Sequence, residues 1–204
     1  MDKIDFILAG VGGQGIVLMG DLLAETAMAA GYDVKKSDIH GMAQRGGSVV
    51  SYVRLAGRVW SPLPKTGEVD FLVGLEKLET ARWASQLHQD GVAIVNDHSI
   101  LPLSVSSGVD PYPTDAQILG SLHARTDLVH WVDGTVLATG LGNPKVVNVV
   151  LLGFLASLLP MSWEVWLSTI ERRVPARYRD LNVRALEAGR KAAEGRSALM
   201  IVAE

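Results

Sequence analysis

The stretch that decides the fold is Ile4–Ile39, IDFILAGVGGQGIVLMGDLLAETAMAAGYDVKKSDI. It begins with Ile4–Ala9, an apolar run long enough for a buried strand, and this run ends in glycines. Apolar residues then recur at helical spacing over Gln14–Ala30, and Gly31 follows at a position where helices commonly end. Asp33–Ile39 is expected to be a second strand. A strand, a glycine turn, a helix and a strand in succession predict an α/β fold.

The remaining sequence continues this alternation up to residue 142 and then becomes helical. The elements expected in the first part are a hairpin of Val49–Leu55 and Arg58–Ser61 around Ala56-Gly57, strands Val69–Gly74, Val92–Asn96 and Asp127–Val132, and helices Glu76–His88 and Ala116–Arg125. Those expected in the second part are a buried helix within Val146–Leu159 after the start signal Asn143-Pro144, and helices Trp163–Arg172 and Tyr178–Glu194. We predict one domain over residues 1–204, with an α/β core (1–142) and a helical C-terminal part (143–204). Its fold class is a three-layer Rossmann-like sandwich on a mostly parallel sheet with a hairpin.

The composition of the chain limits its possible functions. The 19 basic and 22 acidic residues give a net charge of −3, which disfavours a nucleic-acid binder. There is no cysteine, so the chain has no disulfides and no thiolate ligands for an iron–sulfur cluster, and the cytoplasm is the expected compartment. The most apolar stretch, Val146–Leu159, is closed by Pro160 and falls short of the ~20 residues that span a bilayer, so no membrane segment is expected.

The glycine turn Gly10–Gly15, GVGGQG, satisfies the G-x-G-x-x-G pattern between a predicted strand and a predicted helix. Glycines let the backbone approach an anion closely, and the helix start offers free N–H groups to it. In a dinucleotide site, Asp38 would be the ribose-binding acid. The alternative interpretation is that these glycines only pack a strand tightly against a helix. Gln14 adds an amide suited to a polar group in a cleft or across an interface.

A second candidate is the loop His40–Ser48, HGMAQRGGS. If Asp33–Ile39 pairs in parallel beside Ile4–Ala9, this loop and the glycine turn share one edge of the sheet. His40 is then either an acid–base residue or a strand cap, and Arg45 either binds a phosphate or carboxylate or holds the loop by an ion pair. The other histidines (His88, His98, His123 and His130) show no metal-ligand spacing, so no metal site is expected.

Three segments resemble a known family: GVGGQGIVLMGDLLAETAMAAGYDVKKSDIHGMAQRGGSVVSYVR (10–54), GNPKVVN (142–148) and LNVRALEAG (181–189). Together they resemble the small (beta) subunit of indolepyruvate ferredoxin oxidoreductase, within the gamma-domain family of 2-oxoacid:ferredoxin oxidoreductases. The resemblance covers essentially the whole chain. It implies oxidative decarboxylation of a 2-oxoacid, here an aryl pyruvate, with coenzyme A as acyl acceptor and ferredoxin as electron acceptor.

The same resemblance implies thiamine diphosphate, Mg²⁺ and iron–sulfur clusters. Without cysteine this chain cannot ligate a conventional cluster, and it has no G-D-G motif followed by the downstream asparagine of a thiamine diphosphate site. We therefore expect the chain to bind none of these groups alone, and we expect them in a large (alpha) subunit. The other expected partners are ferredoxin and the 2-oxoacid substrate, with neither nucleic acid nor membrane.

The resulting hypothesis is that the two glycine-rich loops dock near the cofactor pocket of the partner. There they would position the 2-oxoacid carboxylate or the coenzyme A phosphates, and Arg45 suits a carboxylate because its planar fork donates two parallel bonds. The candidate catalytic residues are His40, Gln44 and Arg45, and the candidate cofactor-binding residues are Gly10, Gly12, Gly13, Gln14, Gly15, Gly46, Gly47 and Asn143. Two alternatives remain open: a stand-alone NAD(P)- or flavin-binding oxidoreductase, and a purely architectural subunit.

Overall fold

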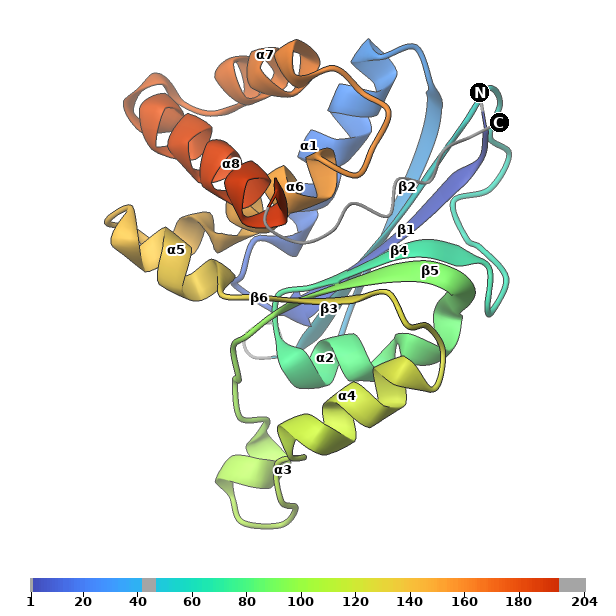
Figure 1. Ribbon diagram of the computed structural model, residues 1–204, viewed down its shortest axis with the longest axis vertical. Coiled ribbons are helices and arrows are strands. Elements are labelled where there is room, and N and C mark those ends of the chain that lie inside the picture. The colour runs from blue at the N-terminus through green and yellow to red at the C-terminus, as the bar shows by residue number, and fades with distance from the viewer. Residues whose placement is uncertain (1, 42–46, 195–204) are drawn as a thin grey trace.

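A six-stranded mixed sheet forms the middle layer of the protein (Figure 1), in a computed structural model that describes residues 2–41 and 47–194. The strand order is β2-β3-β1-β4-β5-β6. Strands β1, β4, β5 and β6 are parallel to their neighbours in this series, whereas β3 runs antiparallel to both β1 and β2. The strands are β1 (Ile4–Val11), β2 (Asp33–His40), β3 (Ser48–Ala56), β4 (Val69–Gly74), β5 (Leu87–Asn96) and β6 (Val129–Val132).

Helices cover both faces of the sheet, which confirms the predicted three-layer α/β fold (Figure 1). Helices α2 and α4 lie on one face, and α1 and α5–α8 lie on the other. The helices are α1 (Ile16–Ala29), α2 (Lys77–Arg82), α3 (Leu103–Ser106), α4 (Asp115–His123), α5 (Gly134–Gly140), α6 (Val147–Ala156), α7 (Trp163–Arg173) and α8 (Arg179–Glu194), with short 3-10 turns η1 (Ala84–Gln86), η2 (Pro144–Val146) and η3 (Ala176–Tyr178).

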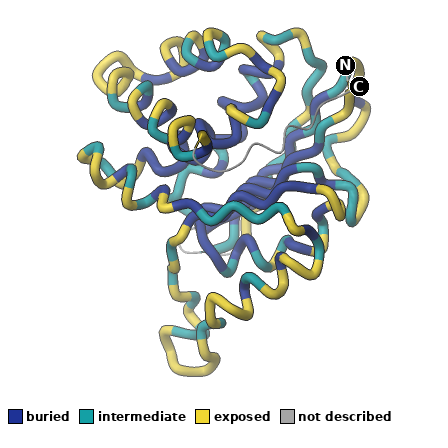
Figure 2. The backbone as a smooth tube through the Cα atoms, in the orientation of Figure 1, coloured by how far each residue is buried: buried dark blue, intermediate teal, exposed yellow. Residues whose placement is uncertain are grey.

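The C-terminal helices pack around α6, in which all ten residues are buried (Figure 2). Helix α8 crosses it where each helix carries a glycine: a Cβ on Gly153 would lie 2.0 Å from the Leu186 carbonyl oxygen, and one on Gly189 would lie 1.8 Å from that of Val150. The two backbones are therefore in direct contact. The apolar stretch is a buried helix, as predicted, and among residues 2–41 and 47–194 no helix is long and apolar enough to cross a membrane.

The hairpin of the sheet is not the one expected from the sequence. Strands β2 and β3 form it, and β3 lies between β2 and β1, so the expected β1–β2 pairing is wrong. Arg58–Ser61 is not a strand, because side chains satisfy its backbone instead. Asp33 Oδ2 accepts the Val59 N–H at 2.7 Å, and Arg54 Nη1 donates to the Ser61 carbonyl at 3.2 Å.

Two further boundaries differ from the prediction. The helix expected over Glu76–His88 ends at Arg82, and β5 already begins at Leu87. Gly91, just before the expected strand Val92–Asn96, lies inside β5 next to a register shift, where a Cβ would be 2.8 Å from the Val69 carbonyl oxygen. Glycine at this position lets the strand continue through the irregularity. Helix α5 was not predicted.

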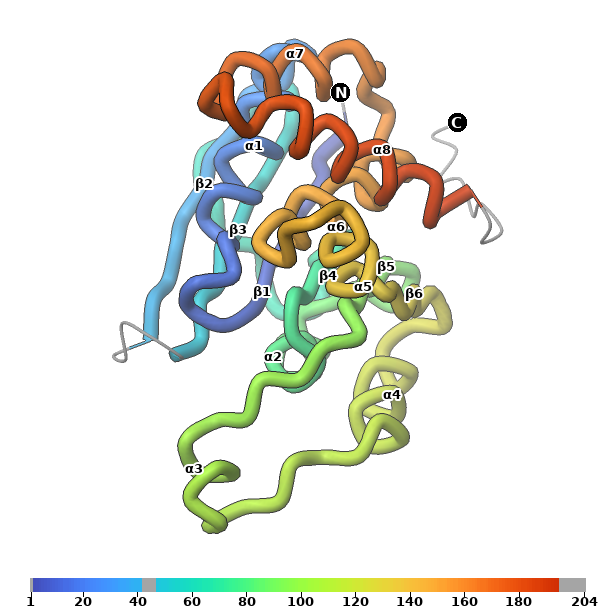
Figure 3. The backbone as a smooth tube through the Cα atoms, turned by 90° about the vertical axis from the view of Figure 1, so that its left-hand side faces the viewer, coloured from blue at the N-terminus to red at the C-terminus, as the bar shows by residue number. Residues whose placement is uncertain are grey.

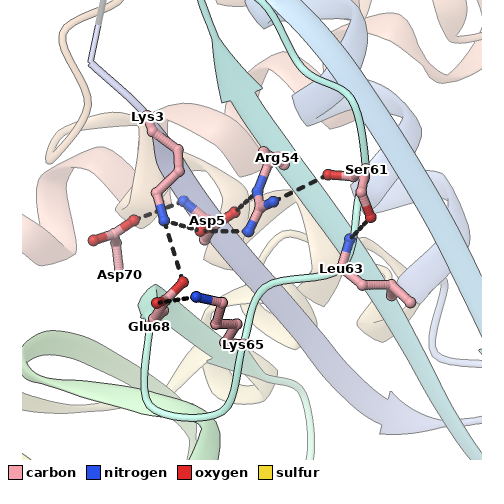
Figure 4. Close-up of polar contacts among 8 residues, drawn as sticks. All are labelled: Lys3, Asp5, Arg54, Ser61, Leu63, Lys65, Glu68 and Asp70. Atoms are coloured by element: carbon pink, nitrogen blue, oxygen red, sulfur yellow. Dashed lines mark hydrogen bonds and ion pairs between the residues drawn. The ribbon is translucent and has the colours of Figure 1, made fainter.

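A cluster of ion pairs around one buried carboxylate lies at the end of the sheet where β1 and β4 begin (Figure 4). The Asp5 carboxylate is fully buried, and it pairs with Arg54 Nη2 at 3.0 Å and with Lys3 Nζ at 2.9 Å. The Asp5 N–H donates to Asp70 Oδ2 at 2.7 Å, and burial raises the pKa of the Asp70 carboxyl above its ordinary value. This cluster therefore joins β1, β3 and β4 at the edge opposite the glycine turn.

Candidate functional site

A cavity of ≈ 480 Å³ opens beside the glycine turn that follows β1. Three segments distant in the sequence line it: the glycine turn, the segment that begins at Asn143, and the connection between α7 and α8. The lining residues are Gly13, Gln14, Gly15, Leu18, Asn143, Lys145, Val146, Asn148, Arg173, Val174, Pro175, Tyr178, Leu181 and Asn182. The fold thus brings together parts of all three segments that carry the family resemblance.

The glycine turn presents the start of α1 to this cavity. Gly13 and Gly15 have φ angles of 102° and 83°, a left-handed conformation that glycine adopts without strain. Gly15 is the N-cap of α1, no side chain caps the helix, and its first turn has no acidic residue. The positive end of the helix dipole therefore faces the cavity without a compensating negative charge from its own first turn.

Asn148, in α6, packs directly on the helix start. Its Nδ2 donates to the Gly15 carbonyl at 3.2 Å, and that carbonyl also accepts the Met19 N–H of the first helical turn. A Cβ on residue 15 would lie 2.6 Å from this Nδ2. The contact couples the C-terminal helical layer to the glycine turn and requires glycine at position 15.

Gln14 forms hydrogen bonds within the chain. Its Oε1 accepts the Val11 N–H at 2.7 Å, and its Nε2 donates to the Leu75 carbonyl at 2.9 Å. Asn96 Nδ2 donates to the same carbonyl at 3.0 Å. The Gln14 amide therefore bridges the carboxyl ends of β1 and β4, the crevice at which open α/β sheets commonly bind ligands. At Gly10 a Cβ would meet Gln14 Oε1 at 2.7 Å, so this glycine serves close packing.

The electrostatics of the cavity favour an anion. Among the residues that the structure describes, its lining contains two cations, Lys145 and Arg173, and no carboxylate. Arg173 is already paired, with its Nε 2.9 Å from Glu25 Oε1 and its Nη2 3.8 Å from Asp21 Oδ2. Lys145 is exposed and has no carboxylate at ion-pair distance in the part of the chain that the structure describes. The uncompensated positive charge thus comes from Lys145 and the α1 start.

The structure brings the two glycine-rich loops into contact at one point, where the Gly12 N–H donates to the Gly47 carbonyl at 2.8 Å. His40 is the exposed last residue of β2, opposite Val49 of β3, and it does not line the cavity. Gln44, Arg45 and Gly46 lie outside the described residues. Asn143 does line the cavity, and its Oδ1 accepts the Lys145 N–H at 3.0 Å.

Asp38 forms an ion pair with a lysine and is not placed to bind a ribose beside the glycine turn. Lys36 Nζ lies 2.8 Å from Asp38 Oδ2 and 2.6 Å from Asp21 Oδ1 of α1. Burial lowers the pKa of the Lys36 ammonium, but the hydrogen bonds to these two carboxylates outweigh that effect, so its pKa is raised. Because β3 separates β2 from β1, the parallel β1–β2 neighbours of the dinucleotide fingerprint are missing here.

Sequence reasoning missed several cavity residues, chiefly Lys145, Asn148 and Arg173. The first two lie within the GNPKVVN motif, which was a usable signal, whereas Arg173 had none. Among the described residues, no three or more histidine, aspartate or glutamate side chains are grouped so that they could hold a metal ion.

The comparison with known proteins defines the class. The sequence profile of the family "Pyruvate ferredoxin/flavodoxin oxidoreductase" matches residues 5–192, and the chain belongs to this family. It is therefore a subunit of an oxidoreductase of the 2-oxoacid:ferredoxin class, which acts on an oxo group with an iron–sulfur protein as acceptor.

Within the family, the chain is similar to indolepyruvate oxidoreductase subunit IorB of Archaeoglobus fulgidus, with 36% identity over 189 residues, covering 92% of this chain and 94% of that relative. This confirms the resemblance to the small subunit. Its fold is similar to that of the keto/oxoacid ferredoxin oxidoreductase gamma subunit from Geobacter sulfurreducens, with a TM-score of 0.70, 24% identity and coverage of 94% and 99%. It is also similar to one third of a 2-oxoglutarate:ferredoxin oxidoreductase chain from Magnetococcus marinus, solved with coenzyme A bound, with a TM-score of 0.75, 16% identity and coverage of 100% and 33%.

Proposed function

We propose that this chain is the small subunit of a cytoplasmic enzyme that oxidatively decarboxylates an aryl pyruvate. In the net reaction the carboxylate of the 2-oxoacid leaves as CO₂ and the acyl group forms a thioester with coenzyme A. The two electrons released reduce two ferredoxins, and one proton is released from the thiol. The similarity to IorB, over nearly the full length of both chains, supports the aryl pyruvate as substrate.

In this proposal the cavity holds phosphates of coenzyme A. The Lys145 ammonium and the free N–H groups at the start of α1 are suited to bind phosphate, and the cavity volume of ≈ 480 Å³ accommodates part of such a ligand. The apolar side chains Leu18 and Leu181 line the same cavity and suit the uncharged part of the molecule. This carboxylate-free, positively charged lining is the single observation that carries the assignment.

The prosthetic groups reside in the large subunit in this proposal. The chain has no cysteine to ligate an iron–sulfur cluster, and the cavity lining has no carboxylate to coordinate the Mg²⁺ of thiamine diphosphate. The residues at the cavity therefore do not fit that cofactor, and we assign the cavity only the binding and orientation of the acyl acceptor. His40, Gln44 and Arg45 then belong to the face that meets the partner, where Arg45 contacts the 2-oxoacid carboxylate or a phosphate.

The test is steady-state kinetics of the co-expressed complex with an aryl pyruvate, coenzyme A and ferredoxin. Lys145→Ala and Arg45→Ala should assemble normally and should raise the KM for coenzyme A or for the 2-oxoacid. The matched control is Lys65→Ala, because Lys65 lies at the other edge of the sheet and is 88% exposed. Unchanged kinetics in both variants would contradict the positioning role and favour the architectural alternative. Tight binding of NAD(P) or flavin by the isolated chain, measured by equilibrium dialysis, would favour the stand-alone oxidoreductase.

A further inference from the structure

The connection from β5 to α4 leaves the sheet at its carboxyl-terminal edge and projects past α2 and α4, away from α7 and α8 (Figures 1 and 3). It comprises residues 97–114, here named the 97–114 arm, and includes the four-residue helix α3. No residue of α3 is buried. The arm therefore adds nothing to the apolar core through this helix.

The first clamp at the base of the arm is Lys77, at the start of α2. Its Nζ lies 3.2 Å from Asp97 Oδ1 and 2.7 Å from Asp115 Oδ1. These two aspartates stand where the chain enters the arm and where it leaves it. Only 10% of the Lys77 side chain is exposed, whereas those of Asp97 and Asp115 are 40% and 60% exposed, so one largely buried ammonium ties the two ends of the arm together.

The second clamp is the neighbouring residue, Glu76, which is 1% exposed. Its Oε1 accepts the Ile100 N–H at 3.2 Å and the Tyr112 hydroxyl at 2.5 Å, one from each side of the arm. Its Oε2 accepts the Glu79 N–H at 2.8 Å and so caps α2. Burial, together with the hydrogen bond to Glu76, raises the pKa of Tyr112 to about 12. Two consecutive side chains thus fix the base of the arm from both sides.

Beyond this fixed base, the tip of the arm exposes apolar side chains. Leu101 is 56% exposed, Leu103 83% and Val109 75%. Asp110 carries the only charge of residues 99–111. A cluster of exposed apolar side chains on a fixed support is typical of a surface that another protein covers. Because the base is already ordered, docking of the tip costs little conformational entropy.

We propose that the 97–114 arm docks into an apolar groove of the large partner subunit, an inference that rests on the proposed function. The arm leaves the sheet at the end of β5, and the glycine turn leaves it at the end of β1. Both strands are parallel to β4, so the two features lie at the same edge. A large subunit that spans this edge to deliver the acyl group to the cavity meets the arm as well. A second copy of this chain would bring no redox centre to that edge.

The experiment compares Leu103→Asp with Leu63→Asp in co-expression with a tagged large subunit. Leu63 is 51% exposed on the connection between β3 and β4, at the opposite edge of the sheet (Figure 4). Leu103→Asp should weaken assembly about tenfold or more, because it introduces a carboxylate into an apolar interface, and Leu103→Ala should weaken it less. Leu63→Asp should assemble like the wild type. The Tm of each isolated variant should stay close to that of the wild type, because both side chains are exposed.

Three results would overturn the proposal. If Leu103→Asp assembles with wild-type affinity into an active complex, the arm does not dock into the large subunit, and the proposed function is left intact. A change in the oligomeric state of the isolated chain on Leu103→Asp would assign the arm to a second copy. No complex between the wild-type chain and the large subunit would refute both proposals together.

Discussion

The glycine turn allows a comparison of two substitutions, Gly13→Ala and Gly15→Ala. Both should introduce backbone strain, but only Gly15→Ala should also disturb the contact with Asn148. Gly13 and Gly15 both have positive φ angles, 102° and 83°, so alanine at either position costs about 1–2 kcal/mol in backbone strain. Among the described residues, a Cβ at position 13 meets nothing within 4 Å, whereas one at position 15 lies 2.6 Å from Asn148 Nδ2. Gly15→Ala therefore also displaces the Asn148 amide and breaks its hydrogen bond to the Gly15 carbonyl, which adds about 1 kcal/mol.

The assay is urea unfolding of Gly13→Ala, Gly15→Ala, Asn148→Ala and the double variant Gly15→Ala/Asn148→Ala. We expect about 1–2 kcal/mol of destabilisation for Gly13→Ala and about 2–3 kcal/mol for Gly15→Ala, and each kcal/mol should lower the Tm by about 2–4 °C. In the Asn148→Ala background, Gly15→Ala should cost only the strain, so the coupling energy should be about 1 kcal/mol. Equal costs for the two glycines with no coupling to Asn148 would refute the close contact.

Three further predictions concern other parts of the molecule. Arg54→Met should destabilise the protein by about 3 kcal/mol in urea unfolding, because it leaves the buried Asp5 carboxylate with Lys3 alone, and a loss below about 1 kcal/mol would contradict the buried pair. Tyr112→Phe should cost about 1.5–3 kcal/mol, because the Glu76 carboxylate loses a donor. The pKa of Tyr112 is raised to about 12, so its contribution to the free energy of unfolding should be complete below pH 10 and should fall as the pH rises from 10 to 12. A difference in unfolding free energy between wild type and Tyr112→Phe that stays constant over this pH range would contradict the prediction. Lys145→Ala should raise the KM for coenzyme A about 2–5-fold at low salt and less at high salt, with kcat unchanged. If the KM of the variant equals that of the wild type at both salt concentrations, Lys145 is not part of the site.

Local signals in the sequence located the first strand, its helix and the glycine turn to within two residues, because strand and helix periodicity and glycine punctuation act over short distances. Such short-range signals do not predict which strands pair with one another in the sheet. The insertion of β3 between β1 and β2 depends on long-range pairing, and the sequence pattern of an apolar strand is the same whichever strand lies next to it. The hairpin was misplaced for a related reason: Asp33, 26 residues away, takes the Val59 N–H that a strand partner would have taken.

The candidate site was predictable to a similar extent. Gly13, Gly15 and Asn143 were identified from motifs, and they do line one cavity. Arg173 could not be found, because it reaches the cavity only through the packing of α7 against α1, where Glu25 holds it. The role of Gln14 was also hidden. Its amide binds the backbone at Val11 and Leu75, and nothing in the sequence links Leu75 to the turn.

The central claim is that this chain performs its reaction only with redox groups held by another subunit. The most direct measurement is ferredoxin reduction by an aryl pyruvate and coenzyme A, assayed with the purified chain and then with the chain combined with its large subunit. We expect no reduction by the chain alone and turnover once both subunits are present. Ferredoxin reduction by the chain alone would contradict the claim.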